Sequence, residues 1–513
     1  MSEALRFEGK RYNFASDRIS MSACCSMDKV DEVFDIAIIG SGSAAFSAAT
    51  YAASHGAKVA MIEEETIGGT CVNVGCVPSK IFIRAGQTVH TQQEHPFVGI
   101  ERHNPSVNPR LLLEQLRQRV EELRVSKYEG VLIHNPNITF IKGKARFIDK
   151  STLKVETSDG TLRKVEGKKV LVTTGSISHI PDIPGLKQSP YWTSTEALYS
   201  GIIPAHLLIL GGSYIAAELA QAFRRLGSQV TMVVRSTLLS REDPDLGEAL
   251  KDIFEREGIV VLTHSLPTSI SYSDDLFCLN LSSSKIIGNQ LLIATGRHAN
   301  TLDLGLEMVG VVTDATNGSI LVDDHMRTNI NSIYAAGDCT TQPQYVYVAA
   351  AAGTRAAMNI LGRDVALDLS IVPAVVFTDP QIATVGLSAS QAEKLGLKAE
   401  SRKLGLESVP RALASFDTRG FIKLVAETGS QRILGAQVLA SDAAGDVIQS
   451  VALAIRGNMT IRDLASQLFP YLTMVEGLKL CAQTFYTDVK KLSCCSDAPP
   501  PDNTAATSVD VGE

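Results

Sequence analysis

Apolar residues recur along the chain in short runs that end at glycine turns. The first run, Phe34–Ile39, is followed by Gly-Ser-Gly, an alanine-rich segment over 44–55 and a second apolar run over 58–62. This order predicts strand, turn, helix and strand, the repeating unit of a parallel sheet. The same order returns over 206–234, so the pattern predicts an α/β protein with two such units.

The rest of the pattern is less regular. Amphipathic spacing predicts a helix over 108–129, and β-rich segments precede the glycines at 175 and 296. From about residue 371 an α+β pattern begins and runs to 491. The last 18 residues are rich in Pro, Asp and Ser, and we expect them to be disordered.

Composition and charge narrow the class of protein. The chain has 513 residues, which fits several domains, and 45% of them are hydrophobic. Its 48 Lys and Arg against 55 Asp and Glu give a net charge of −7, which argues against nucleic-acid binding. No window has the roughly 18 consecutive apolar residues of a membrane helix, and the N-terminus has no apolar core of a secretory signal. We therefore expect a cytoplasmic protein without a membrane partner.

The first glycine turn has the pattern of a dinucleotide site. Gly40-x-Gly42-x-x-Ala45 follows a predicted strand and opens a predicted helix, and Glu63 ends the next strand. The glycines let a pyrophosphate approach the helix N-terminus, and the carboxylate can accept ribose hydroxyls. A tight turn without a ligand is the alternative, but it would not require the acid at that place.

The second turn differs in one position and in its partner residue. Gly211-Gly-Ser has serine where the middle glycine is usual, and the following strand ends at Arg235, with Arg241 close behind. An arginine there suits a 2′-phosphate, so the sequence favours NADPH over NADH. The alternative is that both arginines are ordinary solvated surface charges.

Two cysteines with four residues between them stand in a glycine-rich turn. The segment reads Gly68-Gly69-Thr70-Cys71-Val-Asn-Val-Gly-Cys76-Val-Pro78-Ser-Lys80. A helix beginning near Pro78 would lower the pKa of these thiols through its dipole, which predicts a redox-active dithiol. Two buried structural cysteines would leave the double glycine and the Pro-Ser-Lys unexplained.

This cysteine segment, placed after the first glycine turn, resembles the flavin-dependent pyridine nucleotide-disulfide oxidoreductases, the family of dihydrolipoamide dehydrogenase and glutathione reductase. The resemblance implies that FAD binds at the first unit, with Gly69, Thr70 and Lys80 near it, and that Asp338 of Ala-Ala-Gly-Asp binds the ribityl chain. It also implies a homodimer with active sites shared between subunits.

The same resemblance assigns roles around the thiols. Cys76 is expected against the flavin as the charge-transfer thiol, and Cys71 is expected to exchange with substrate. Lys80 and Glu218 would form an ion pair near flavin N5, and Tyr214 would gate the nicotinamide pocket.

The resemblance also divides the chain into segments. We expect a polar leader at 1–32, the two parts of the FAD domain at 33–190 and 311–370, the NADPH domain at 191–310, a dimerisation domain at 371–491 and a flexible tail at 492–513.

The C-terminal domain departs from the disulfide-reducing members, which use a histidine as proton shuttle there. This chain has Phe-Pro-Tyr471 in the corresponding segment, and its last histidine is His325. Beyond the last expected helix stand Cys494 and Cys495, and thiolates in a mobile segment select soft metals and exchange them readily. This combination resembles the branch of the family that reduces thiol-bound Hg(II), with Cys71, Cys76, Cys494 and Cys495 as metal ligands and Tyr471 lining the site.

Two other functions are alternatives for this chain. A disulfide reductase of the lipoamide or glutathione type would need the missing histidine, and a non-catalytic thiol protein that sequesters metal would not need two nucleotide sites. The pair Cys24 and Cys25 is interpreted as incidental, and Cys278, Cys339 and Cys481 as small packed side chains.

Overall fold

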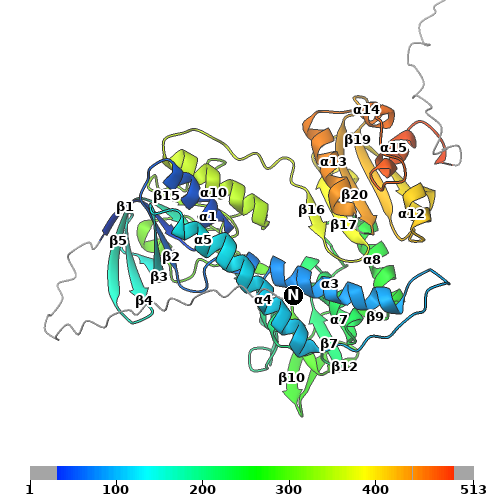
Figure 1. Ribbon diagram of the computed structural model, residues 1–513, viewed down its shortest axis with the longest axis horizontal. Helices are drawn as coiled ribbons and strands as arrows, with labels where there is room; N and C mark the ends of the chain where they lie inside the picture. Colours follow the sequence, from blue (N-terminus) through cyan, green and yellow to red (C-terminus); the bar gives the residue numbers. More distant parts are fainter. Residues whose placement is uncertain (1–31, 442, 490–513) are drawn as a thin grey trace, which may run out of the picture.

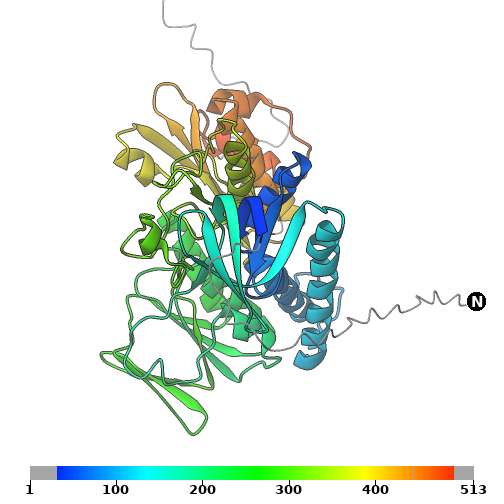
Figure 2. The same ribbon diagram turned by 90° about the vertical axis from the view of Figure 1, so that its left-hand side faces the viewer.

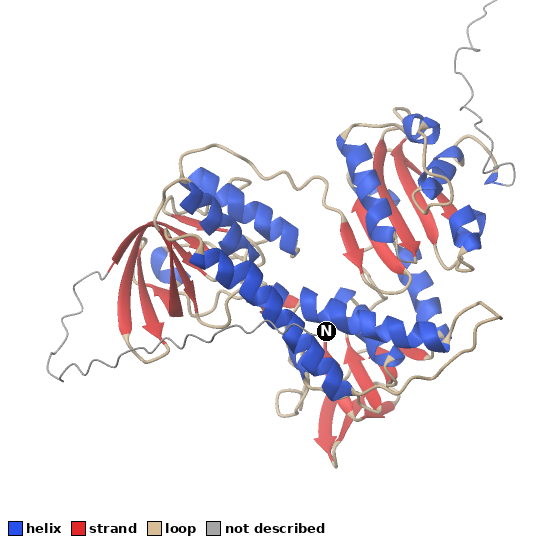
Figure 3. Cartoon of the chain, viewed as in Figure 1, coloured by secondary structure: helices blue, strands red, loops and turns tan. Residues whose placement is uncertain are grey.

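The computed structural model describes residues 32–441 and 443–489. Its elements form three bodies, each built on its own sheet (Figures 1 and 3). In Figure 1 the first body lies on the left, the second at the lower centre and the third at the upper right. The fold class predicted from the sequence, two nucleotide-binding units followed by an α+β domain, is confirmed.

The first body is a six-stranded sheet with helices on its faces. Strand β1 pairs in parallel with both β2 and β5, and β15 returns from far along the chain to pair with β5. In Figure 2 these strands face the viewer, with the second body below them and the third above. The strands are β1 (Glu32–Ile39), β2 (Val59–Glu63), β3 (Ile138–Phe147), β4 (Thr152–Thr157), β5 (Leu162–Val172) and β15 (Ile333–Ala335).

Its helices include two that contact each other backbone to backbone. Helix α10 lies so close to α1 that a Cβ on Gly353 would stand 2.1 Å from the carbonyl oxygen of Ala44. The helices are α1 (Ser43–Ser54), α2 (Gly69–Asn73), α3 (Cys76–Gln93), α4 (Pro109–Arg124), a π-helix (Val125–Glu129), α5 (Gly130–Ile133), α9 (Leu306–Val309) and α10 (Val346–Ile360). A short ribbon of β6 (Ser176–Ser178) and β14 (Arg297–Ala299) leads to and from the second body.

The second body repeats the strand, turn and helix order around a four-stranded parallel sheet, β13-β7-β8-β9. Helix α3 of the first body packs on its helix α7, with the Phe82 and Phe223 rings 4.8 Å apart. Its elements are α6 (Ser194–Tyr199), β7 (His206–Leu210), α7 (Tyr214–Arg225), β8 (Gln229–Val233), α8 (Pro244–Arg256), β9 (Ile259–Leu262), β13 (Gln290–Ile293) and an antiparallel sheet of β10 (Ser269–Ser273), β11 (Leu276–Asn280) and β12 (Lys285–Gly288).

The third body is a five-stranded antiparallel sheet, β16-β17-β20-β19-β18, with helices packed on it. The strands are β16 (Ala374–Val376), β17 (Gln381–Gly386), β18 (Ala399–Gly405), β19 (Phe421–Glu427) and β20 (Ile433–Ala440). The helices are α11 (Ala389–Lys394), a 3-10 turn (Leu406–Ser408), α12 (Pro410–Ala414), α13 (Ala444–Arg456), α14 (Ile461–Ser466) and α15 (Glu476–Gln483).

Two sequence predictions about helices need correction. The helix expected over 108–129 ends as an α-helix at Arg124 and continues as a π-helix to Glu129. The helix expected to begin near Pro78 begins two residues earlier, at Cys76, with Gly75 as its N-cap. Across the described ranges, the helices are too short or too polar to cross a bilayer.

Candidate functional site

The two cysteines of the glycine-rich turn lie at adjoining helix ends. Cys71 is in the short helix α2, and Cys76 is the first residue of α3. Both are free thiols, and their side chains hydrogen-bond to each other. Cys76 is exposed and Cys71 is half-buried, so the structure brings together the pair that the sequence predicted.

The surroundings of the two thiols separate their acidities. The hydrogen bond from Cys71 is the main cause that lowers the pKa of Cys76 to about 7, and the charge of Lys80 acts in the same direction. The same hydrogen bond, followed by burial, raises the pKa of Cys71 far above its usual range. The thiolate of the pair is therefore carried by Cys76, and it becomes the main form of that side chain as the pH rises above about 7.

Lys80 lies one helical turn after Cys76 and is paired with a buried carboxylate. Its Nζ is 2.7 Å from Oε2 of Glu218, whose side chain is only 8% exposed. The two residues are on α3 and α7, so the ion pair joins the first and second bodies. The contact matches the pairing that the family resemblance implied, while its role near a flavin stays a prediction.

The first glycine turn has the shape that a dinucleotide needs. Gly40 has a φ of +108°, and a Cβ there would meet the carbonyl oxygen of Thr173 at 2.5 Å. Gly42 caps α1, and a Cβ added there would have the Cα of Gly69 as its nearest neighbour, at 4.0 Å, so a phosphate can approach the backbone at the helix N-terminus. Ala45 is buried behind this turn. At the end of β2, Glu63 accepts hydrogen bonds from Ser41 Oγ at 2.6 Å and from the Glu65 backbone at 2.7 Å.

A partly buried carboxyl group follows β15. Asp338 accepts a hydrogen bond from Ser176 Oγ at 3.1 Å, and Ser176 Oγ in turn accepts one from Arg297 Nε at 2.8 Å. Burial raises the pKa of Asp338 above its usual range. A carboxyl group held this way can accept the hydroxyl of a polyol chain. Together with the open glycine turn, it fits a bound FAD.

The second glycine turn repeats the packing of the first. Gly211 has a φ of +137°, and a Cβ there would meet the carbonyl oxygen of Ala294 at 2.2 Å. Ser213, in the place of the middle glycine, is the N-cap of α7. Arg235 and Arg241 are both exposed and form no ion pair with any residue of the described ranges, so their side chains are available to a phosphate.

Tyr214 opens α7 and is tied to a carboxylate that the sequence analysis did not single out. Its hydroxyl donates a hydrogen bond to Glu242 and is also hydrogen-bonded to Tyr345. Burial first, and the charge of Glu242 second, raise the pKa of Tyr214 far above its usual range. Tyr214 is therefore a neutral phenol at physiological pH.

A cavity of about 870 Å³ opens beside Cys76 and Lys80. Its walls are mostly apolar and come from α3, α4 and the segment 197–203, with the charged side chains Arg84, Arg119 and Glu122 among them. A reactant can therefore reach the α3 side of the thiol pair through a space of ligand size.

Asn73, between the two cysteines, holds their turn in shape and was not singled out from the sequence. Its Nδ2 donates to the carbonyl oxygens of Ile67 at 2.8 Å and Gly69 at 2.9 Å, and its Oδ1 accepts from Arg124 at 3.3 Å. The only signal for it in the sequence is its place inside the Cys71 to Cys76 segment.

The other positions predicted from the sequence are Tyr471 and the cysteines outside the Cys71 and Cys76 pair. Tyr471 lies in the third body, between α14 and α15, and its side chain is 58% exposed. Cys24, Cys25, Cys494 and Cys495 lie outside the described residues. Cys339 and Cys481 are fully buried, as expected, whereas Cys278 is only partly buried because it is on the outer antiparallel sheet.

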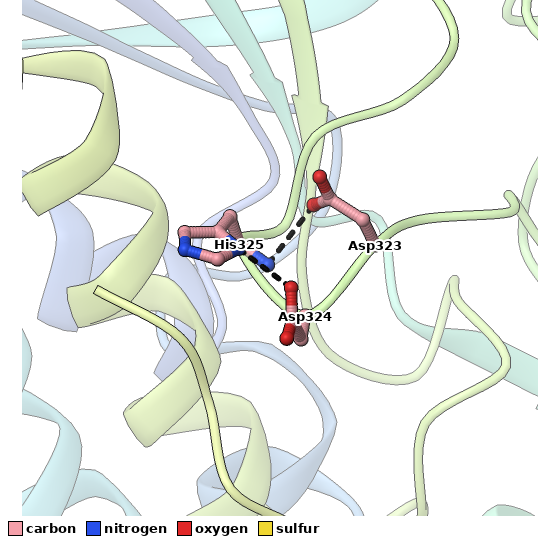
Figure 4. Close-up of side chains that lie close together, drawn as sticks. All are labelled: Asp323, Asp324 and His325. Atoms are coloured by element: carbon pink, nitrogen blue, oxygen red, sulfur yellow. Dashed lines mark hydrogen bonds and ion pairs between the residues drawn. The ribbon is translucent and has the colours of Figure 1, made fainter. Parts of the chain in front are cut away.

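A carboxylate and imidazole cluster lies elsewhere, in the loop before β15 (Figure 4). His325 Nδ1 is 2.6 Å from Asp324, and Asp323 accepts the backbone N–H groups of His325 and Arg327 at 2.9 and 2.8 Å. These bonds close a turn and satisfy the polar atoms, so the cluster has a structural explanation.

Comparison with known families assigns most of the chain. Residues 34–353 match the pyridine nucleotide-disulphide oxidoreductase family, and residues 372–482 match the dimerisation domain of that family. The first match covers the first and second bodies, and the second match covers the third body.

Relatives of similar length are proteins named mercuric reductase. One from Acidithiobacillus ferrooxidans is 56% identical over 90% of this chain and 84% of its own length. Another from Shewanella putrefaciens is 51% identical over 96% and 90%, and one from Streptomyces lividans is 45% identical over 90% and 98%.

Among solved structures, the chain is similar to a Cu(II) complex of the HOCl-induced flavoprotein disulfide reductase RclA from Escherichia coli. The TM-score is 0.80 at 28% sequence identity, covering 88% of this chain and 99% of that one.

Proposed function

This chain belongs to the pyridine nucleotide-disulphide oxidoreductase family, and from that premise we propose that it is an NADPH-dependent mercury(II) reductase that converts thiol-bound Hg(II) to elemental mercury. Membership of this family, together with the names of the relatives, supports the use of a flavin and a pyridine nucleotide by this chain. The more specific assignments, FAD and NADPH, are part of the proposal.

One observation favours a metal ion over a disulfide as substrate. Cys71 and Cys76 form a dithiol with a single thiolate, yet the segment 371–491 has no histidine that could protonate a leaving thiolate. A thiol pair without such an acid suits a soft cation, because both sulfurs can bind the ion as thiolates and no substrate disulfide has to be cleaved.

FAD binding is assigned to the first body. Gly40, Gly42 and Ala45 would receive the pyrophosphate, Glu63 the ribose hydroxyls and Asp338 the ribityl chain, with Gly69, Thr70 and Lys80 beside it. When bound, FAD supplies two-electron transfer between the nucleotide and the dithiol.

NADPH binding is assigned to the second body. Gly211 lets the nucleotide approach α7, and the exposed Arg235 and Arg241 would bind its 2′-phosphate. Tyr214 would cover the nicotinamide pocket as a neutral phenol held by Glu242.

Hg(II) is the substrate of the thiols in this proposal. Cys494 and Cys495 accept the ion from small thiol complexes and pass it by ligand exchange to Cys71 and Cys76, and Tyr471 lines the path. The thiolate of Cys76 forms the first sulfur–metal bond and displaces one carrier thiolate. Cys71 forms the second bond and displaces the other carrier thiolate, which takes up the proton that Cys71 releases. The two electrons of one NADPH hydride convert Hg(II) to Hg(0), both sulfur–metal bonds break, and of the two freed cysteine thiolates the one on Cys71 takes up the proton of the hydride.

A homodimer is supported by the match to the dimerisation domain over residues 372–482. The proposal places Tyr471, Cys494 and Cys495 of one subunit at the dithiol of the other. In this proposal, residues 33–190 and 311–370 bind FAD, residues 191–310 bind NADPH, residues 371–491 form the dimer, and residues 492–513 deliver Hg(II).

The test compares substrates for the purified holoenzyme. NADPH oxidation should depend on added Hg(II) in the presence of excess small thiol, and it should be negligible with glutathione disulfide or lipoamide. Faster oxidation with either disulfide would make the chain a disulfide reductase. Reduction of the flavin absorbance by NADPH, in turn, would dismiss a purely sequestering protein.

A further inference from the structure

The segment 235–243 connects β8 with α8 and carries three side chains of the second nucleotide unit. Arg235 and Arg241 are exposed, and they are the residues assigned to the 2′-phosphate. Glu242 accepts the hydrogen bond of the Tyr214 hydroxyl. The position of this segment therefore affects both arginines and the tyrosine at the start of α7.

The second body itself holds the segment as far as Leu239. The backbone N–H of Leu239 donates to the carbonyl oxygen of Gly212 in the glycine turn at 2.8 Å, and the Leu239 side chain is buried. Helix α8 packs closely behind, because a Cβ on Gly247 would stand 2.3 Å from the carbonyl oxygen of Leu238. Both contacts lie on the β8 side of Arg241.

The last residue of the segment is held by the third body. Asp243 is the N-cap of α8, and its Oδ1 accepts the backbone N–H of Asp245 at 3.1 Å. Its Oδ2 lies 2.8 Å from Nζ of Lys423 on β19, and the same ammonium is 3.1 Å from Asp245. The side chains of Asp243 and Lys423 are 4% and 13% exposed. One oxygen of Asp243 thus caps the helix, and the other forms a buried ion pair with another body.

The charges at this contact show that the carboxylates place the lysine. The N-terminus of a helix carries a partial positive charge, which disfavours a cation such as Lys423 at the start of α8. Burial also acts to lower the pKa of Lys423, but its hydrogen bonds to Asp243 and Asp245 raise that pKa above the usual value. Removing one partner of such a pair leaves a buried charge without its counter-ion, so the pair resists separation.

A separate contact joins the second and third bodies at α7. Arg225 lies 2.9 Å from the Asp379 carboxylate, and Gln221 donates to the Asp379 carbonyl oxygen at 2.8 Å. These bonds do not involve the segment 235–243. Loss of the Lys423 ion pair would therefore release the end of the segment while the two bodies stay connected.

We propose that Lys423 is a positioning residue of the nucleotide site, because its ion pair with Asp243 holds the segment that presents Arg235 and Arg241 to the 2′-phosphate. The third body, which matches a dimerisation domain, thereby takes part in the choice of nucleotide. This role rests on the proposed function in one respect, the assignment of the 2′-phosphate to the two arginines. Side chains that are already in place lose less conformational entropy when they bind.

The experiment measures the dissociation constants of NADP⁺ and NAD⁺ for the oxidised holoenzyme by calorimetry, without mercury. Lys423→Met should raise the constant for NADP⁺ about fivefold and that for NAD⁺ less than about twofold, since NAD⁺ has no 2′-phosphate. Asp243→Asn removes the same ion pair but keeps a favourable N-cap residue, and it should have the same effect. Both variants should therefore lower the preference for NADP⁺ over NAD⁺.

These two variants distinguish positioning from a general effect of charge. Lys423→Met removes a positive charge and Asp243→Asn removes a negative one, so simple attraction of the phosphate would change in opposite directions. A matched control is Lys403→Met, since the Lys403 ammonium pairs with Asp245 at 3.2 Å but with no carboxylate of the segment within the described residues. It should keep the wild-type preference.

Two results would overturn the proposal: an unchanged preference in Lys423→Met and Asp243→Asn, or changes of opposite sign in the two. Retained flavin absorbance shows which variants are folded, and Asp243→Asn alone decides the matter if Lys423→Met does not fold. Equal binding of both nucleotides by the wild-type enzyme would instead refute the NADPH assignment, and this role of Lys423 with it. Mercury reduction is tested separately, because no metal is present in the titration.

Discussion

At the scale of single residues, the thiol pair shows how contacts produce reactivity. Cys76 and Cys71 are chemically the same group, yet the hydrogen bond between them favours the thiolate on one and opposes it on the other. Lys80 adds a positive charge on the side of Cys76. The site therefore has a nucleophile and a protonated partner before any reactant arrives.

This asymmetry predicts the pH dependence of alkylation. Because the folded-state pKa of Cys76 lies below the ordinary thiol value, its thiolate is present above a pH of about 7 and is lost as the pH falls through that value. In the reduced protein, the rate of Cys76 modification should rise with a midpoint near 7, while Cys71 stays unmodified there. A midpoint at the ordinary thiol value for both cysteines would contradict the account.

The choice of nucleotide is also decided by single residues. Arg235→Glu should raise the KM for NADPH about tenfold or more and change that for NADH little, because only NADPH has a 2′-phosphate for a charge-assisted contact. Steady-state kinetics with both nucleotides measure the effect. Arg256→Glu, the same charge change on an exposed residue at the end of α8, is the matched control. Equal effects of Arg235→Glu on both nucleotides would refute the assignment.

The sequence predicted residues whose role depends on local spacing. Cys71 and Cys76 could be paired because only four residues separate them, and Glu63 because it ends a strand after a glycine turn. Lys423 and Glu242 could not be found in this way, because their partners Asp243 and Tyr214 are far along the chain and only tertiary packing brings them together.

At the scale of elements, close helix packing supports the first nucleotide turn. Helix α1 begins at this turn, and α10 presses against its first residues at Gly353. A glycine in the middle of a helix lowers the stability of that helix, because its backbone loses more conformational entropy on folding than other residues do. Gly353 is nevertheless suited to this position, because a side chain there would collide with the Ala44 backbone.

Gly353→Ala should therefore destabilise the first body by about 1–3 kcal/mol, because a Cβ there would collide with the Ala44 backbone. Denaturant unfolding followed by flavin fluorescence measures the loss. Gly99→Ala, at a site with nothing within 4 Å of the new Cβ, is the control and should change stability little. An unchanged unfolding midpoint for Gly353→Ala would show that α1 and α10 can separate without cost.

Some boundaries of helices and strands could be predicted from the sequence, and others could not. Strand β7 has the predicted limits, because its apolar run is bounded by polar residues and a glycine. The start of α3 was misplaced because Pro78 is favourable in a first helical turn but does not have to be the first residue. The π-helix after α4 has no signature in the hydrophobic pattern.

At the scale of the whole molecule, polar contacts join the three bodies, and the proposed dimer adds a second chain to the site. The ion pair between Lys80 and Glu218 and the contacts of Asp379 with α7 connect these bodies. The fold class predicted from the sequence, two nucleotide-binding units followed by an α+β domain, agrees with this arrangement. The family resemblance implied the ion pair of Lys80 and Glu218, whereas the contacts of Asp379 with α7 were not predictable from the sequence, because the hydrophobic pattern does not show which surfaces of the bodies meet.

The shared site predicts complementation between subunits. A Cys494→Ala, Cys495→Ala double variant and a Cys71→Ala, Cys76→Ala double variant should each lose turnover with bulky dithiol complexes of Hg(II). Heterodimers of the two should recover up to half of the wild-type rate per dimer, because one complete site remains. Activity is measured after mixed refolding and separation by affinity tags. Heterodimers that form but stay inactive would show that the terminal pair does not serve the partner's dithiol.

The central claim is that electrons from NADPH reduce Hg(II) at the Cys71 and Cys76 pair. The most direct measurement is the ratio of mercury vapour released to NADPH oxidised, with excess small thiol and with Cys71→Ser as the reference. The account predicts one Hg(0) for each NADPH in the wild-type enzyme and none in the variant. NADPH oxidation without release of Hg(0), or equal release by the variant, would contradict it.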